Sequence, residues 1–360
     1  MTTEARLQIP PELTVRVPAP AMRAATEDLF QAAGMPADQA AQAADVLIWA
    51  DLRGVDSHGV SNMMAFYLKD FQSGNTNARP EWKVTHETMA TANIDCDRGL
   101  GLVVGPAAMR LSIEKAQATG IGCVVAHNGR HFGAAGYHAA LALGHDMVGL
   151  AMTVGGLSVV PTFGAKPMVG LNPLAIAAPT RHEAPFLFDA SMSSVAGNKI
   201  RLARRLGAPV AAGWIARTDG TPVMEEEQVP DNFLMLPLGA TREIGSHKGY
   251  SLAVMVDILC GLLAGTGPGF QTVGTVSHHF MAYRIDAFTD AETFKDQMDG
   301  YMKALRETPP APGQERVYYA GLPDAEAEAD RRANGIPYHR EVIDQFRAWA
   351  KEYGTPDRLG

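Results

Sequence analysis

The sequence predicts an α/β protein of two or more lobes that lacks a Rossmann nucleotide site. Its 360 residues can bury a large core and exceed the usual size of one domain. Apolar, β-branched segments of strand length alternate with longer segments of helical periodicity. Gly99, Gly101 and Gly105 resemble a dinucleotide fingerprint, but the spacing is one residue too long and no acidic residue closes a second strand at the expected distance. Close packing of a helix on a strand explains these glycines more simply.

The N-terminal part of the chain is predicted to be helical. Glycine and proline signals separate a helix over 20–33 from a second one over 36–52. Ser57 is a candidate N-cap of a third helix. His58 would then lie in the first turn, where the helix dipole disfavours imidazolium and keeps the ring neutral.

Strands dominate the middle of the chain. Residues 82–96 alternate as paired strands do, and 121–126 forms an apolar run typical of a buried strand. The remaining elements are expected in this order: a helix at 106–118, a short helix at 139–142, strands at 148–154, 168–179 and 186–188, a helix at 193–206, a hairpin turn at 219–220, a buried helix at 251–265, a strand at 271–285, and helices at 287–306, 324–332 and 341–353.

Composition narrows the class of protein. The net charge of −8 gives no basic footprint for nucleic acid or for an acidic membrane. The most apolar segment, 251–265, is too short to span a bilayer and carries Asp257. The three cysteines have no CxxC spacing, lie in apolar surroundings and are interpreted as buried, reduced thiols. The N-terminus has no secretory pattern, so a cytoplasmic location is expected.

The most prominent candidate site is the glycine-rich stretch 127–138, which follows the strand at 121–126. It contains His127, His131 and His138, and imidazole exchanges protons near neutral pH. A glycine-rich turn with solvated histidines is the alternative interpretation of this pattern.

Two further segments carry candidate groups. Asp189 ends an apolar strand and is followed by hydroxyl side chains, which is typical of a site, although it would also suit as a cap of the helix at 193–206. Lys248 lies in a glycine-bounded loop that opens onto a helix, where backbone N–H groups and a lysine form a plausible anion site.

Metal and hydrolase chemistry fit these residues poorly. His127 and His131 have the spacing of a helical zinc pair, but Asn128-Gly129 between them argues against a helix, so no metal is expected. A hydrolase built from Ser57, His58 and Asp189 lacks a G-x-S-x-G elbow, and adjacent Ser and His are not expected to hydrogen-bond as nucleophile and base. The remaining interpretation is general acid–base chemistry beside an anionic cofactor.

Five segments, in order along the chain, closely resemble the malate/L-lactate dehydrogenase family of the second, non-Rossmann type. This family includes ureidoglycolate and sulfolactate dehydrogenases and cyclic ketimine reductases. The resemblance runs from about residue 20 to about residue 354. The segments are Asp51 to Gly59, Asn128 to Tyr137, Gly170 to Ile176, Asp189 to Lys199 and Lys248 to Leu252.

The resemblance implies a fold and a cofactor. The fold is a non-Rossmann NAD(P)-binding domain around a large mixed sheet, with a helical domain formed by both chain ends. Residues 1–80 would be the N-terminal helical part of domain I, 81–285 the central NAD(P)-binding and catalytic domain, and 286–360 the C-terminal helices that return to domain I. The cofactor would be NAD or NADP, which the sequence does not distinguish, and the protein would be a homodimer that binds neither nucleic acid nor membrane.

The resemblance also implies roles for individual residues. His131 matches a proton donor and acceptor, with His58 as the second candidate, and Ser57, His58 and Asp189 match a proton relay of the ketimine reductases. His127 and His138 revert to structural or solvated roles. The residues matched to cofactor contacts are His131, Phe132, Gly133, Asn172, Pro173, Asp189, Ala190, Ser191, Lys248 and Gly249.

The sequence departs from the family pattern where a substrate carboxylate is expected. Many relatives carry an arginine four residues after the Ser-His-Gly histidine and a tyrosine four residues later; here these positions hold Asn62 and Phe66. An amide cannot replace a bidentate guanidinium. Arg53 or Arg130 would have to compensate, or the substrate is larger, less anionic or an imine. Ala320-Gly321-Leu322 also replaces a frequent Pro-Gly-Glu.

The implied function is an NAD(P)-dependent oxidoreductase that moves a hydride between nicotinamide and a 2-oxo/2-hydroxy acid or a related carbonyl. The alternative within enzymes is reduction of the C=N bond of a cyclic 2-ketimine acid. A nucleotide-binding protein without catalytic activity is the alternative from another class.

Overall fold

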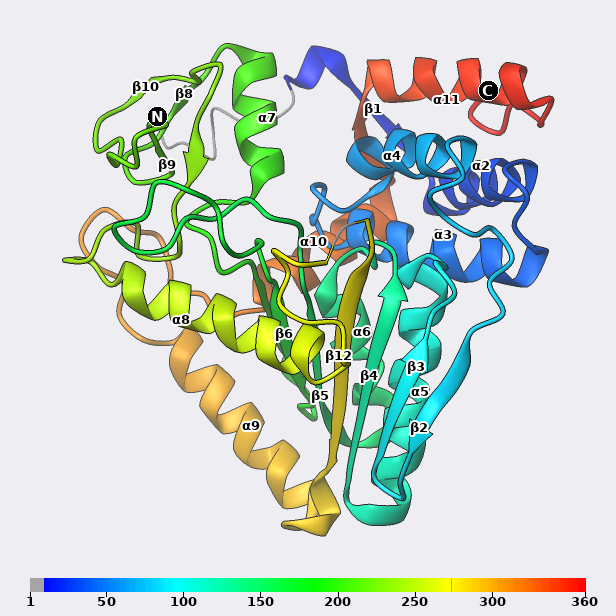
Figure 1. The fold of residues 1–360 in the computed structure, drawn as a ribbon, viewed down its shortest axis with the longest axis vertical. Coiled ribbons are helices and arrows are strands. Elements are labelled where there is room, and N and C mark those ends of the chain that lie inside the picture. The colour runs from blue at the N-terminus through cyan, green and yellow to red at the C-terminus, as the bar shows by residue number, and fades with distance from the viewer. Residues whose placement is uncertain (1–9, 273) are drawn as a thin grey trace.

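A mixed seven-stranded sheet forms the centre of the computed structural model, which describes residues 10–272 and 274–360 (Figure 1). The pair β3–β4 is parallel and the other neighbours are antiparallel. This arrangement confirms the predicted α/β class with a mixed sheet. The strands, in spatial order, are β2 (Lys83–Glu87), β3 (Thr91–Asp95), β4 (Ile121–Gly129), β12 (Val276–Arg284), β5 (Met147–Thr153), β6 (Leu174–Ala178) and β7 (Phe186–Ala190).

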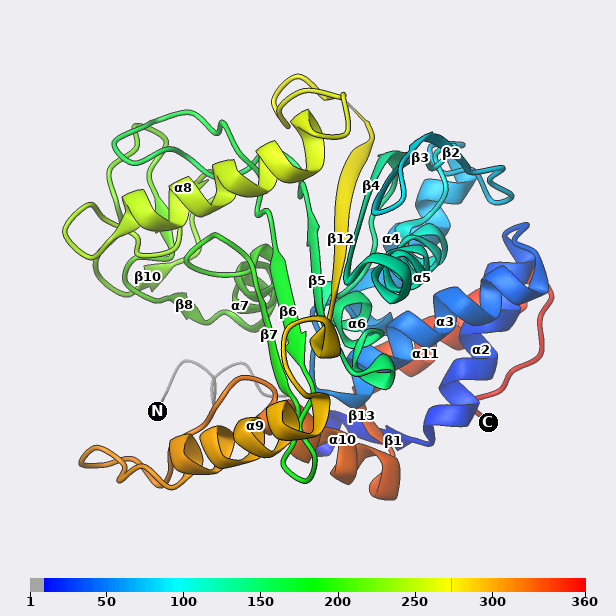
Figure 2. The ribbon, with the colours of Figure 1, turned by 90° about the horizontal axis from the view of Figure 1, so that it is seen from below.

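Helices cover both faces of this sheet (Figure 2). One face carries α5 (Gly101–Thr119) and α6 (Ala135–Ala140), and the other carries α8 (Ser246–Asp257) with the π-helical turn η3 (Ile258–Leu262). Glycine permits the close approach of α5, because a Cβ at Gly122 would lie 1.9 Å from the carbonyl oxygen of Ser112.

The N-terminal and C-terminal segments pack into one hydrophobic cluster beside the sheet. Phe30, Leu47, Tyr67, Tyr338 and Phe346 are each at most 2% exposed within it. A short antiparallel pair, β1 with β13, joins the two ends of the chain. The elements are β1 (Thr14–Val17), α2 (Ala19–Ala32), α3 (Ala37–Leu52), α4 (Val60–Gln72), β13 (Ile336–His339) and α11 (Arg340–Tyr353).

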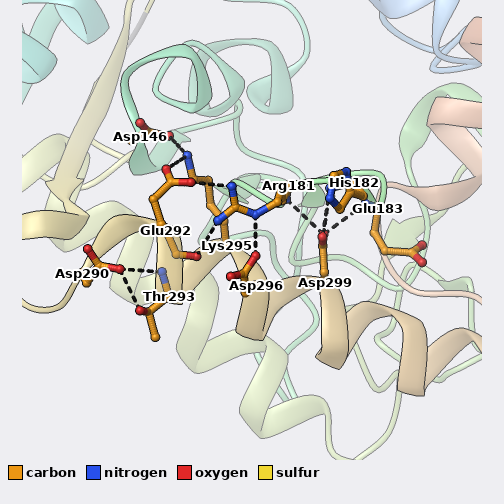
Figure 3. A network of polar contacts seen from close by, with 10 residues as sticks. All are labelled: Asp146, Arg181, His182, Glu183, Asp290, Glu292, Thr293, Lys295, Asp296 and Asp299. Carbon is orange, nitrogen blue, oxygen red and sulfur yellow. Dashed lines mark hydrogen bonds and ion pairs between the residues drawn. The ribbon is translucent and has the colours of Figure 1, made fainter.

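The remaining elements form a small lobe and a bridge. A separate hydrophobic cluster organises the lobe around α7 and four two-residue strands. The long helix α9 crosses beside the β6–β7 turn, where the carboxylate of Asp299 accepts hydrogen bonds from the backbone N–H groups of residues 181–183 (Figure 3). The elements are α7 (Gly197–Leu206), β8 (Pro209–Val210), β9 (Ile215–Ala216), β10 (Glu227–Gln228), β11 (Leu234–Met235), α9 (Ala291–Arg306), α10 (Leu322–Asn334) and the 3₁₀ turns η1 (Pro11–Leu13), η2 (Leu143–His145) and η4 (Ile285–Ala287).

Several predicted boundaries are wrong. The helix expected from residue 106 begins at Gly101, with Pro106 in its interior. The helix expected from 193 begins at Gly197, and residues 168–173 precede the strand β6 rather than belonging to it. The short helix expected at 139–142 lies at 135–140.

The segment 251–265 is helical as far as Leu262 and buried on one face only, which corrects the prediction of a buried helix. Leu252, Ile258, Leu262 and Leu263 are 40%, 50%, 49% and 57% exposed. The inner face of the helix packs on the sheet while the outer face is apolar and uncovered. Among residues 10–272 and 274–360, no helix combines the length and apolar character needed to cross a membrane.

Candidate active site

The predicted site residues converge on one edge of the sheet because several strands end or begin there. Antiparallel pairing places the start of β6 beside the end of β7, with Leu174 opposite Ala190. It also places the end of β4 beside the start of β12, with Gly129 opposite Val276. The segments 130–136, 172–174 and 189–191 therefore lie at the same edge, although they are far apart in the sequence.

His131 and His58 lie face to face at this edge. Their rings are 5.8 Å apart between centroids and only 6° from parallel. The Nδ1 atom of His58 is 2.9 Å from Oγ of Ser57, and Nδ1 of His131 is 2.7 Å from the hydroxyl oxygen of Tyr67. The hydrogen bond between adjacent Ser57 and His58 contradicts the expectation that these neighbours cannot form one.

Both imidazoles are neutral at physiological pH. Burial lowers the pKa of His58 to about 4. Burial, together with the nearby histidines 58, 278 and 138, lowers the pKa of His131 to about 3. Each residue as a whole is nevertheless partly exposed. The unprotonated nitrogen of a neutral imidazole has a lone pair that can accept a proton.

The segment that carries Ser57 and His58 is fixed by a buried carboxylate. Asp51, 1% exposed, accepts a hydrogen bond from the backbone N–H of Val60 at 3.1 Å and one from the Tyr338 hydroxyl at 2.8 Å. Helix α4 therefore begins at Val60 with Gly59 as N-cap, so Ser57 is not the cap and His58 precedes the first turn. A side chain at Gly59 would collide with this carboxylate, since its Cβ would lie 1.6 Å from Oδ1 of Asp51.

Asp189 reaches the same region from the end of β7. Its carboxylate accepts a hydrogen bond from the backbone N–H of Gly136 at 2.6 Å, in the first turn of α6. The residue is exposed to solvent, yet protein surrounds the carboxyl group and desolvation, with a contribution from Asp324, raises its pKa to about 6. Asp189 caps α6 rather than the helix at 193–206, and its hydrogen bond goes to the backbone rather than to a histidine.

Two residues predicted to contact the cofactor have their side chains inside the protein. Asn172 is fully buried; its amide nitrogen donates to the carbonyl of Ala253 at 2.8 Å, and its oxygen accepts from the N–H of Gly155 at 3.0 Å. Phe132 is 1% exposed and lies between the rings of His138 and His278, with centroid distances of 4.6 and 4.9 Å. These two side chains support the backbone of the site rather than lining it.

The other predicted cofactor residues are more accessible. Lys248 is exposed in the first turn of α8, while Gly249 is buried against Leu238. Pro173, Ala190 and Ser191 are partly exposed at the strand ends, and Gly133 has a positive φ of 78° beside His131.

The arginines expected to compensate for Asn62 are already paired. Arg53 lies 2.8 Å from Oε2 of Glu328, and Arg130 makes a buried pair with Asp70 at 2.6 Å. The amide nitrogen of Asn62 donates to the carbonyl of Asp56. Both guanidinium groups thus already hold a carboxylate of the protein, and compensation for Asn62 by either of them stays a prediction.

Phe66 forms an open wall of the site. It is 45% exposed, and its ring meets that of His131 edge to face at 5.9 Å between centroids. Asn62 and Phe66 therefore stand where the resemblance predicts an arginine and a tyrosine, respectively.

Sequence reasoning missed the buried groups behind the histidines, namely Asp51, Tyr67 and Asp70. Only Asp51 had an available signal, because it is a carboxylate within an otherwise apolar helical segment. The described residues contain no group of three or more His, Cys, Asp or Glu side chains that could hold a metal ion.

Comparisons with known proteins identify the family of this chain. The sequence profile of the family described as malate/L-lactate dehydrogenase matches residues 17–347. The malate dehydrogenase of Pyrococcus abyssi is 37% identical over 348 residues, which cover 95% of this chain and 96% of that protein. The NAD(+) ureidoglycolate dehydrogenase of Escherichia coli O157:H7 is 28% identical over 323 residues, covering 87% and 88%.

Solved structures agree with these relatives. The malate dehydrogenase structure from Pyrococcus horikoshii OT3 superposes with a TM-score of 0.87 at 34% identity, covering 97% of this chain and 98% of that chain. The resemblance carried by the five segments is therefore confirmed: the chain belongs to the malate/L-lactate dehydrogenase family and is a dehydrogenase.

Proposed function

We propose that this protein is an NAD(P)-dependent dehydrogenase of 2-hydroxy acids, with malate as the first substrate to test and His131 as general acid–base. The observation that carries the proposal is the neutral, stacked and partly exposed pair His58–His131 at the sheet edge. The names of the relatives support the substrate class, since malate and ureidoglycolate are both 2-hydroxy acids.

The residues at the start of α8 fit an anionic nucleotide. A helix N-terminus carries partial positive charge, and here it lies beside the exposed side chains of Lys248 and Arg242. These groups would hold the phosphates, and the segments 131–133, 172–173 and 189–191 would hold the nicotinamide half. When bound, NAD(P) accepts or donates the hydride at the substrate carbon.

The chain's own residues handle the proton. In the oxidative direction, Nε2 of neutral His131 takes the proton of the substrate hydroxyl. In the reductive direction, the imidazolium returns it to the carbonyl oxygen. His58, stacked on His131 and hydrogen-bonded to Ser57, is the alternative proton acceptor, and Asp189 orients the backbone of α6 beside them.

We also propose the family's domain division and a homodimer. Residues 1–80 and 286–360 would form domain I, and 81–285 the cofactor domain. The uncovered apolar face of α8 and η3, together with Phe270 at 45% exposure, is the surface that a second copy would bury. Sedimentation of the wild type and of Leu262→Glu would test this, since the proposal predicts a dimer and a monomer respectively.

The function is tested by nicotinamide absorbance with NAD(+) and NADP(+) in separate assays. Malate-dependent reduction of either cofactor supports the proposal, and the preferred cofactor follows from the two rates. Turnover of a cyclic 2-ketimine acid but of no 2-hydroxy acid would replace it with an imine reductase. Cofactor binding without turnover of any of these compounds would replace it with a nucleotide-binding protein that lacks catalytic activity.

A further inference from the structure

The backbone of Ser57 is held by a side chain of the small lobe. Asn198 lies in the first turn of α7, and its amide nitrogen is 2.6 Å from the carbonyl oxygen of Ser57. A backbone carbonyl can only accept a hydrogen bond, so the NH₂ group of Asn198 donates it, which fixes the orientation of the amide. The contact joins two residues that are 141 positions apart in the sequence.

The carbonyl of Ser57 needs a donor from outside α4. The helix begins at Val60 with Gly59 as N-cap, so this carbonyl lies before the hydrogen bonds of the helix. The preceding carbonyl, that of Asp56, accepts from the amide nitrogen of Asn62 at 2.7 Å. Two asparagine side chains thus hold two consecutive carbonyl groups, and the small lobe supplies one of them.

Hydrophobic packing connects α7 and α4 to different parts of the molecule. Ile200 of α7 belongs to the hydrophobic cluster of the small lobe. Val60 and Met64 of α4 belong to the cluster formed by the two chain ends, and the two clusters have no residue in common. The hydrogen bond of Asn198 is therefore a direct link between the small lobe and the segment that precedes α4.

This link acts on the peptide group that carries His58. The carbonyl of Ser57 and the N–H of His58 belong to one planar peptide unit. Asn198 holds the carbonyl, and the N–H donates to the carbonyl of Val55 at 2.9 Å. With both polar groups bound, the plane has one orientation, which directs the His58 side chain toward His131, where the rings stack at 5.8 Å between centroids.

We propose that Asn198 is a positioning residue that fixes the Ser57–His58 peptide and keeps His58 stacked on His131. The proposal rests on the proposed function only for its effect on turnover, because the stacking is a property of the free protein. Asn198 does not touch the substrate in this account and acts entirely through the Ser57–His58 peptide.

Three variants isolate the role of the amide. Asn198→Ala removes it, and alanine has the higher helix propensity, so a weakened α7 would not explain a change in the Ser57–His58 peptide. Asn198→Gln keeps an NH₂ donor on a longer side chain. Asn93→Ala is the matched control, since it removes another partly buried amide, which donates to the carbonyl of Ala264 at 3.1 Å and makes no contact with Ser57.

The first readout is NMR of the free protein with ¹³C-labelled histidine rings. The signals of His58 and His131 are assigned by their loss in His58→Gln and His131→Gln. Each ring lies in the ring current of the other, so a change in stacking shifts both signals. We expect both to shift in Asn198→Ala, to return toward the wild-type positions in Asn198→Gln, and to stay unchanged in Asn93→Ala. Unchanged signals in Asn198→Ala overturn the proposal.

Turnover supplies a second readout. Loss of one neutral hydrogen bond should lower kcat of Asn198→Ala by about 3- to 10-fold while KM for malate changes little. A higher KM with unchanged kcat would mean that Asn198 contacts the substrate, which overturns the positioning role. If the wild type turns over no 2-hydroxy acid, shifted histidine signals still support the positioning role and the proposed function alone fails.

Discussion

Four histidines, one of them His131 itself, gather at the segment 130–133 as two pairs with opposite surroundings. His58 and His131 stack directly on each other and remain partly accessible. His138 and His278 are fully buried and enclose the ring of Phe132 between them. Burial lowers the pKa of all four, so protonation state does not distinguish the pairs. Exposure does distinguish them: His58 and His131 form the open pair, to which the proposed function assigns the proton transfer, and His138 and His278 form the sealed pair.

The sealed pair has a mechanical role in this account. The Nε2–H of His138 donates to the carbonyl of Phe132 at 2.7 Å, and Nδ1 of His278 lies 2.7 Å from the hydroxyl of Thr153. The first contact fixes the backbone immediately after His131, and the second holds the imidazole that stacks on Phe132. In the proposed function one half of the histidine cluster performs the chemistry, and we propose that the other half holds it in place.

The largest expected effect is on the open pair. His131→Gln should lower kcat by about 10²- to 10⁴-fold, because it removes the proton acceptor, while the melting temperature stays close to that of the wild type. Steady-state kinetics with the preferred cofactor and calorimetry measure the two quantities. If His131→Gln lost its fold along with its activity, the open pair would also be needed for stability, which would contradict the comparison.

Phe132→Ala should produce the opposite pattern and chiefly affect stability. Removing a ring enclosed by two imidazoles leaves a cavity, which costs about 3–5 kcal/mol of unfolding free energy. Urea titration of Phe132→Ala beside the wild type measures this loss. A change below about 1 kcal/mol, within the range of surface substitutions, would mean that the sealed pair does not hold the segment.

The sealed pair should also make stability depend on pH. The folded-state pKa of His138 is about 4 and that of His278 about 3, both below the usual value of 6.5 for an unfolded chain. Below pH 6.5 the unfolded chain therefore binds protons that the folded chain does not, and unfolding becomes easier as the pH falls. His138 alone should contribute a loss of about 3 kcal/mol between pH 7 and pH 4.

His138→Gln tests this assignment, since a glutamine amide still donates to the Phe132 carbonyl but does not titrate. Unfolding free energies measured at pH 7, 5.5 and 4 should fall less steeply in the variant. Parallel curves for variant and wild type would assign the acid sensitivity to other groups.

The smallest expected effect is on KM and concerns Asn62 and Phe66, beside the open pair. Asn62→Arg combined with Phe66→Tyr introduces the family's usual cation and hydroxyl next to His131. A charge-assisted pair with a substrate carboxylate should lower KM for malate by about tenfold, with kcat little changed. An unchanged KM for malate would place the substrate carboxylate away from α4.

The sequence was most informative where a signal is local. The apolar run 121–126 predicted β4, and the alternation over 82–96 predicted β2 and β3. The pairing of β1 with β13 was missed, because four-residue strands at opposite chain ends carry no local pattern. The helix over 251–265 was misplaced as buried, since its apolar outer face cannot be told from a core face by composition.

The site divides in the same way. The motif around Ser57 and His58 and the glycine-rich stretch around His131 were recognisable, because chemistry concentrates there in a few residues. Tyr67 was not recognisable as part of the site, since a tyrosine on an amphipathic helix is typical of the hydrophobic core. Its hydroxyl oxygen lies 2.7 Å from Nδ1 of His131, a residue 64 positions away in the sequence. The pairing of Arg53 and Arg130 with carboxylates depends on the tertiary fold in the same way.

A crystal structure with NAD(P) and an inhibitor analogue of a 2-hydroxy acid tests the central claim most directly. We expect the oxygen equivalent to the substrate hydroxyl to lie about 2.6–3.2 Å from Nε2 of His131, with Nδ1 still in contact with Tyr67. An inhibitor oxygen bound instead to His58 or Asp189, with Nε2 of His131 facing away, would contradict it.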